Sequence, residues 1–268
     1  PTSKMDITYW MNKELLDRGL GNEYVTLNCA VEATSIGDRS CCCLLPQDRF
    51  ISQHIQDDDV LVVSIGGNDV ALKPSPCTVC NLLSLVYCST TECISNLGCG
   101  VALPCDDYCM GGACGCASNL LAFPCGMGYF IHLFKTRVES VIRNILLRSK
   151  GTPKVIYVCM IYYLDEKESG SWADVALKGM KYNTNPEKLK SFISKIFELA
   201  TQQIYLYGTT VIGIPLFHIL DGTDTTDYVA RVEPSVKGGE KVSKFIMDYI
   251  FNDKDKDRTA CVDENMVR

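Results

Sequence analysis

The sequence predicts an α/β fold in which helices cover both faces of a mostly parallel sheet. Four apolar runs are continuous and rich in β-branched residues, as buried parallel strands are, and do not alternate with polar residues. These runs are 24–31 (YVTLNCAV), 60–65 (VLVVSI), 154–161 (KVIYVCMI) and 209–215 (TTVIGIP). Helical patterns lie between and after them, and strands that alternate with helices indicate a parallel sheet.

Three segments carry apolar residues at helical spacing, and we expect them to form long amphipathic helices. They are 130–146, 186–207 and 239–251. Asn185 before Pro186 is a favourable N-cap followed by a proline that the first helical turn accepts. Ligands of open parallel sheets bind beyond the carboxyl ends of the strands. The functional residues are therefore expected in the loops that follow the four runs.

Length and composition predict one large domain. The chain has 268 residues, of which 47% are hydrophobic and 22% charged. We expect a single domain over 1–251 with a Cys-rich insertion at 76–126, and a charged tail at 252–268. No apolar run reaches the ~18–20 residues of a transmembrane helix. The net charge of −6 argues against a nucleic-acid partner and against a basic membrane-surface protein, since both depend on Lys and Arg.

Cysteine is unusually frequent, with 16 residues in the chain. Three interpretations of the insertion stay open: disulfides formed in an oxidising compartment, a zinc site, or reduced thiols that pack the segment. Cys77 and Cys80 have the spacing of half a tetrahedral zinc site, but no second C-x-x-C pair occurs at standard spacing. No Asn-x-Ser/Thr sequon is present, which favours an intracellular protein, cytoplasmic or in an organelle matrix, over a secreted one.

The sharpest chemical signal is the motif Ser64-Ile-Gly-Gly-Asn-Asp69, directly after the run 60–65. Two glycines allow a tight turn and a close approach of the backbone to a ligand. The Asn68 side-chain amide can donate to a developing oxyanion. The alternative is an ordinary glycine-rich turn that Asn and Asp cap.

This motif, together with the order of strands and helices, resembles the SGNH (GDSL) hydrolase family over about 3–250, apart from the insertion. The resemblance implies a flavodoxin-like three-layer α/β/α sandwich. It also implies hydrolysis of carboxylic esters by a serine nucleophile, with an acyl ester as ligand and no required cofactor. Gly67 and Asn68 match the family's third block, and Asn68 would be the oxyanion donor.

The first two blocks of the family match less well. Ser3 stands at the nucleophile position, but Pro1 and Thr2 replace the family's Gly-Asp. The family's first strand would lie before Pro1, so we expect further residues upstream. Ala33 occupies the glycine position of the second block, where its backbone N–H would still be available to an oxyanion.

The last block departs most from the family. Glu233 stands at the histidine position and Ala230 at the aspartate position. A carboxylate does not replace an imidazole that shuttles a proton and is oriented by an aspartate. His218 follows the last predicted strand and is an alternative base. His54 and His132 lie in helical patterns and are expected to be structural.

Two functions follow from these observations. The first is a catalytically impaired protein on the hydrolase fold, a structural or scaffolding subunit whose partner contacts 76–126. The second is an active serine carboxylic-ester hydrolase in which His218 or Glu233 serves as base for Ser3.

Overall fold

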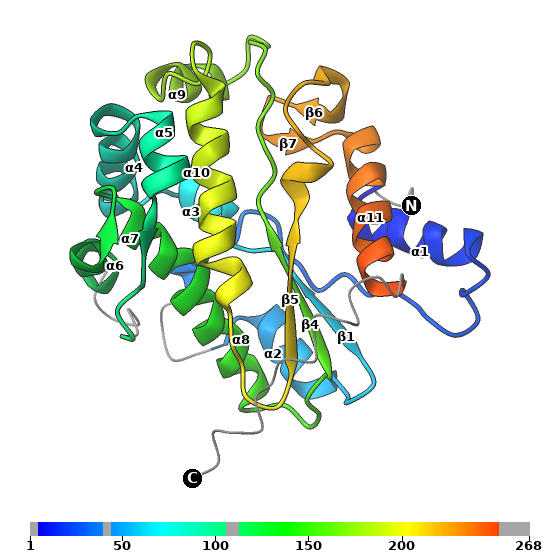
Figure 1. Ribbon diagram of the computed structural model, residues 1–268. Coiled ribbons are helices and arrows are strands. Elements are labelled where there is room, and N and C mark those ends of the chain that lie inside the picture. Colours follow the sequence, from blue (N-terminus) through cyan, green and yellow to red (C-terminus); the bar gives the residue numbers. More distant parts are fainter. Residues whose placement is uncertain (1–4, 40–43, 106–112, 252–268) are drawn as a thin grey trace.

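The computed structural model describes residues 5–39, 44–105 and 113–251. Its centre is a three-stranded parallel sheet in the order β1-β4-β5 (Figure 1), formed by Val60–Val63, Val155–Met160 and Thr210–Pro215. These strands match three of the four predicted runs. In the register, Val63 lies beside Val158, which lies beside Gly213.

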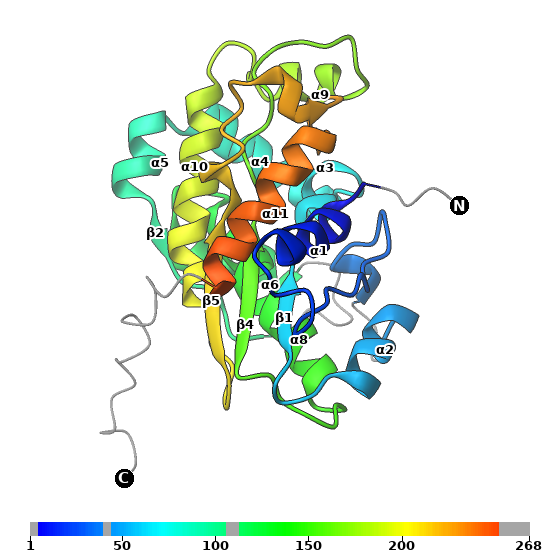
Figure 2. The same ribbon diagram turned by 90° about the vertical axis from the view of Figure 1, so that its right-hand side faces the viewer.

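Alternate residues of β4 divide the interior into two hydrophobic cores. Ile156 and Met160 pack into the core beneath α10 (Pro186–Leu199) and the helix of α7 (Met127–Ile131) and α8 (Val138–Leu146). Tyr157 and Cys159 pack on the other face against α1 (Ile7–Asp17) and α11 (Val236–Phe251). Figure 2 shows α1 and α11 together in front of the sheet. This is the three-layer α/β/α arrangement that was predicted.

The helix predicted at 130–146 is continuous from α7 to α8 through a π-helical segment, His132–Arg137. The helix predicted at 186–207 begins as expected, with Asn185 at the N-cap position, but ends at Leu199. Beyond it, Ile204 and Leu206 are buried while Tyr205 and Tyr207 are exposed. This period-two alternation belongs to extended backbone, so the apolar residues that suggested further helix serve the approach to β5.

The run 24–31 forms no strand, contrary to the prediction. Val25 and Leu27 are 83% and 68% exposed. In the part of the chain that the structure describes, β1 pairs only with β4, so no neighbour supplies a ladder for this run. Instead, the backbone N–H of Thr26 donates to Asn12 Oδ1 at 2.8 Å and its carbonyl accepts from Asn12 Nδ2 at 2.9 Å. A side chain of α1 thus takes the role of a neighbouring strand.

The segment 76–126 extends the helical layer that contains α7 and α10. Its helices α4 (Pro76–Cys88) and α5 (Thr91–Leu97) contribute Leu85 and Ile94 to the same core as the sheet. A short ribbon, β2 (Cys99–Gly100) with β3 (Ala122–Phe123), and α6 (Ala113–Ser118) complete it. Cys105 and Cys114 form a disulfide, whereas Cys80, Cys88, Cys99 and Cys125 carry exposed free thiols.

The remaining elements are short. They are α2 (Pro46–His54), α3 (Gly67–Ala71), α9 (Ala173–Gly179), the ribbon of β6 (Tyr228–Val229) and β7 (Glu233–Pro234), and 3-10 turns at Gly37–Arg39, Asn119–Leu121, Thr201–Gln203, Leu216–His218 and Thr225–Asp227. Among the described helices, none is by itself long and apolar enough to cross a membrane. The pair α4–α5 taken together has the length and composition of a membrane-spanning segment, although the pair is bent by 104°.

Candidate functional site

The turn after β1 is built around Gly66, which caps α3 with a left-handed φ of 100°. A Cβ at Gly66 would lie 2.7 Å from Cε1 of Phe134, so both conformation and space require glycine there. A Cβ at Gly67 would meet Cγ2 of Ile161 at an ordinary 3.5 Å. Gly67 therefore places α3 against the end of β4, while Gly66 makes the turn.

Asn68 and Asp69 hold the loop that follows 24–31. The Asn68 Nδ2 donates to the carbonyl of Thr34 at 2.8 Å. The buried Asp69 carboxylate accepts from the backbone N–H groups of Ile36 at 2.7 Å and Gly37 at 2.9 Å. Burial raises the pKa of Asp69, and these two N–H groups act against the rise. An amide nitrogen carries two hydrogens, and among the described residues an acceptor is found for one of those on Asn68 Nδ2.

Ala33 lies beside this contact and adopts a left-handed φ of 61°. That conformation favours glycine and costs an alanine roughly 1–2 kcal/mol. The backbone at residue 33, where the resemblance places a glycine, therefore has a conformation that glycine adopts readily. Ala33 and Asn68, the two oxyanion candidates from the sequence, belong to loops that the Asn68–Thr34 hydrogen bond joins.

Ser3, the predicted nucleophile, lies outside the described residues. The first helix of the described chain, α1, has Asp6 as its N-cap, and the Asp6 carboxylate accepts from the N–H of Tyr9 at 2.9 Å. Its other carboxylate oxygen accepts from Asn28 Nδ2 at 3.0 Å. The start of α1 is thus tied to the segment that leads into Ala33.

The end of β4 connects the Gly-Gly-Asn turn to the last block. Ile161 touches the site of Gly67, and the hydroxyl of Tyr162 donates to the carbonyl of Val232 at 2.8 Å. Burial raises the pKa of Tyr162, and the nearby Glu233 carboxylate raises it further. Glu233 therefore lies near Tyr162, at the carboxyl edge of the sheet.

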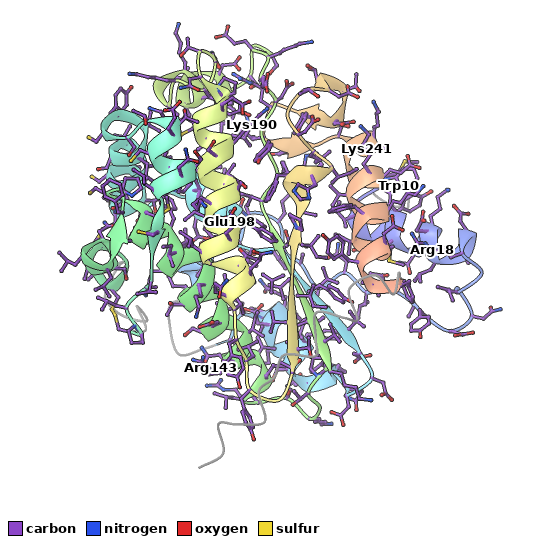
Figure 3. All side chains as sticks on the ribbon, in the orientation of Figure 1. Trp10, Arg18, Arg143, Lys190, Glu198 and Lys241 are labelled. Atoms are coloured by element: carbon purple, nitrogen blue, oxygen red, sulfur yellow. A yellow bond between two sulfur atoms is a disulfide. The ribbon has the colours of Figure 1, made fainter. Side chains whose placement is uncertain are left out.

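Glu233 is exposed on β7 and has no aspartate at position 230 to orient a partner. Ala230 and Arg231 are both left-handed, with φ of 50° and 71°. The nearest buried carboxylate in this stretch, Asp227, pairs with Lys241 Nζ at 2.6 Å. Figure 3 shows Lys241 on α11, the helix that follows β7. The Asp227 carboxylate thus forms an ion pair with Lys241.

Arg231 is a structural residue that the sequence did not single out. Its fully buried guanidinium donates to the Asp165 carbonyl at 2.9 and 3.0 Å, to the Asn183 side chain at 3.0 Å and to the Asp174 carboxylate at 2.9 Å. It therefore fastens the loop between β4 and α10 to the ribbon of β6 and β7. Arginines are mostly exposed, so nothing in the sequence pattern distinguished this one.

His218, the alternative base, is exposed at the end of the 3-10 turn after β5. Its ring packs edge-on against Phe217, with centroids 4.8 Å apart. Within the described chain no hydrogen bond to its imidazole is found, so no carboxylate orients it. The other two histidines lie elsewhere: His54 stacks on Phe50, and the buried His132 contacts the carbonyl of Cys105 through Nε2 at 3.0 Å.

The proposed zinc ligands lie one turn apart on α4. Cys77 is half-buried and packs with the hydrophobic core, whereas Cys80 is exposed. Across 5–39, 44–105 and 113–251, no three His, Cys, Asp or Glu side chains are grouped as metal ligands would be. The described residues thus supply at most two of the four ligands of a tetrahedral site.

A cavity of about 560 Å³ lies away from these residues. The cavity is lined by residues at and just after β2, by the helix that runs from α7 through the π-helical segment into α8, and by residues at and just after the end of α10. Lys135 and Glu139 form an ion pair in its wall at 2.7 Å. None of the sequence-predicted site residues contributes to its lining.

Neither a protein-family model nor a curated protein matches this sequence. One solved structure that resembles it is a protein from Streptococcus pneumonia provisionally described as a platelet activating factor. The identity is 13%, the TM-score is 0.46, and the alignment covers 91% of this chain and 79% of that one.

Proposed function

We propose that this chain is an ester-hydrolase-like protein of the SGNH type that does not carry out the family's serine–histidine chemistry. We further propose that it acts as a structural or scaffolding subunit. One observation carries the proposal: Glu233, at the histidine position, is a solvent-exposed carboxylate, and Ala230 supplies nothing to orient it.

The chemical argument concerns proton transfer. A family-type base must take the serine proton and return it to the leaving group, which an oriented imidazole does. A carboxylate becomes a stronger base when burial removes water from it, and Glu233 lies in water. Loss of one triad member typically lowers the rate by several orders of magnitude. The replacement at 233 therefore favours binding over turnover.

A scaffolding subunit needs a surface that contacts its partner. Within 76–126, the β2–β3 ribbon carries exposed apolar side chains that would serve as this surface. Val101, Leu120 and Phe123 are exposed there, Leu120 to 88%. Large apolar side chains gathered at a surface mark protein contacts. A chain that purifies natively as a monomer with nothing bound would count against this part of the proposal.

The second candidate is an active serine ester hydrolase with a variant base. The left-handed Ala33 and the side-chain amide of Asn68 support it, because an oxyanion site would use a backbone N–H and an amide donor of this kind. His218 or Glu233 would then serve as the base for Ser3.

Labelling with a fluorophosphonate probe separates the two candidates. We expect no labelling of the folded wild-type chain beyond that of its Ser3→Ala variant. Labelling that Ser3→Ala abolishes would contradict the proposal and establish the hydrolase. Esterase assays with p-nitrophenyl acetate should agree with the labelling.

A double variant tests the cause of the impairment. Ala230→Asp with Glu233→His rebuilds the family's pair, and aspartate tolerates the left-handed backbone at 230 better than most residues. We expect this variant to gain Ser3-dependent labelling. The matched control, Ala230→Asp with Glu233→Gln, should gain none, because it supplies no imidazole.

A further inference from the structure

The outer face of α4 is apolar, although its inner face already serves the core. Leu82 and Leu85 are buried, whereas Val79, Leu83 and Tyr87, spaced four residues apart, are exposed. Residues four apart lie on one side of a helix. A helix at a protein surface normally keeps one polar side, so this exposed stripe is unusual.

A second apolar stripe lies on α9, a helix whose last residue contacts Tyr87 of the first stripe. Trp172 and Val175 are exposed, Val175 to 82%, while Leu177 on the opposite side is buried. The hydroxyl of Tyr87 donates to the carbonyl of Gly179, the last residue of α9, at 2.8 Å. Figure 1 shows α9 beside the upper end of α4. We call the surface of Val79, Leu83, Tyr87, Trp172 and Val175 the α4–α9 face.

The charges at the α4–α9 face are positive. Lys178 and Lys181 are exposed on and just after α9, and Lys181 Nζ lies 4.5 Å from the centre of the Tyr87 ring. The one acid of α9, Asp174, is paired with the buried Arg231 at 2.9 Å, and α4 has no acid at all. On α4 and α9 themselves, the exposed charges are thus basic, although the net charge of the chain is −6.

We propose that the α4–α9 face docks onto the surface of a bilayer that contains anionic lipids, with its apolar side chains inserted among the head groups. Exposed aliphatic residues flanked by Trp, Tyr and Lys have the composition that proteins present to the membrane–water interface. The lysines would reach the lipid phosphates, while the aromatic rings lie at head-group depth.

A lipid surface fits this face better than a protein does. The Tyr87 hydroxyl already donates to Gly179, and the other four side chains of the face can form at most one hydrogen bond, through Trp172. Protein interfaces carry about one hydrogen bond per 100–200 Å², which this face does not offer.

Vesicle flotation with the full chain tests the proposal. We expect binding to vesicles of phosphatidylcholine mixed with phosphatidylserine, and weaker binding to phosphatidylcholine alone. Leu83→Glu and Val175→Glu should each weaken binding about tenfold or more, because each places a carboxylate at the inserting surface. Lys178→Gln should weaken binding about fivefold, and only to the anionic vesicles.

The matched control is Leu147→Glu, which adds the same charge at a leucine 73% exposed beyond α8. It should bind as the wild type does. All three glutamate substitutions are at exposed sites, so equal unfolding midpoints will show that each variant is folded.

Three results would overturn the proposal. One is no flotation with either vesicle, and another is equal binding by Leu83→Glu, Val175→Glu and Leu147→Glu. The third is a change in the mass of the lipid-free particle on substitution of Leu83 or Val175, which would make the face a protein contact. None of these readouts depends on Ser3, so the serine labelling is judged separately.

Discussion

Single buried polar residues hold the carboxyl edge of the sheet in place. Asp69 fixes the loop after 24–31 through two backbone N–H groups, and Arg231 fixes the loop before α10 through carbonyls and the Asp174 carboxylate. Removing one partner of such a buried contact leaves the other unsatisfied, which costs more than the contact itself contributes. These contacts hold the loops around the candidate site in place independently of catalysis.

Cys159 gives a prediction about pH. It is buried in the core beneath α11, and burial raises its pKa from 9.0 to about 12. Between these values the unfolded chain releases this proton while the folded chain keeps it, so stability falls as pH rises. From pH 8 to pH 10 this thiol should lower the free energy of unfolding by roughly 1 kcal/mol.

Urea unfolding in reducing buffer at both pH values measures this effect. Cys159→Ala should lose stability less steeply between pH 8 and pH 10 than the wild type does. The control Cys80→Ala removes an exposed thiol and should retain the wild-type slope. Equal slopes for all three proteins would contradict the prediction.

At the scale of elements, close backbone approaches decide how α11 joins the sheet edge. A Cβ at Gly238, in the first turn of α11, would lie 2.1 Å from the carbonyl oxygen of Asp227. That carbonyl also accepts from the N–H of Ser235 at 2.8 Å, so it has little freedom to move. The helix packs here because residue 238 has no side chain.

Gly238→Ala should therefore lower the free energy of unfolding by about 1–3 kcal/mol through overpacking. At Gly179, the end of α9, a Cβ would meet no atom within 4 Å, and the φ there is not left-handed. Gly179→Ala should be neutral or stabilising by up to about 1 kcal/mol. Urea unfolding measures both, and equal effects of the two substitutions would refute the packing argument.

At the scale of the whole molecule, β4 is the strand that its neighbours enclose most completely. This strand pairs with β1 and β5 and is covered on both faces. The run 24–31 has no paired neighbour in the described chain, and its Val25, Leu27 and Val31 side chains are exposed. The two segments have similar composition but opposite environments.

Hydrogen exchange should separate them clearly. Amides of 155–160 should exchange only on global unfolding, whereas most of 24–31 should exchange at least about a hundredfold faster. Within that run, Thr26 should be slower than its neighbours because its N–H donates to Asn12. Protection of all of 24–31 equal to that of β4 would mean that the run pairs as a strand.

The sequence alone determined the parts of this protein that depend on local pattern. The continuous apolar runs at 60–65, 154–161 and 209–215 predicted the three strands, because residues that must be buried on both faces leave no polar alternation. Helical periodicity located α8, α10 and α11, and two adjacent glycines located the turn that presents Asn68.

Only the tertiary structure decided which groups find partners across the chain. The run 24–31 has the residues of a strand but no strand beside it in the described chain, and pairing is a property of two segments rather than one. The burial of Arg231, the left-handed Ala33 and the exposure of Glu233 likewise depend on contacts with distant residues. Sequence patterns report what a side chain prefers, whereas the packing of the whole chain settles what surrounds it.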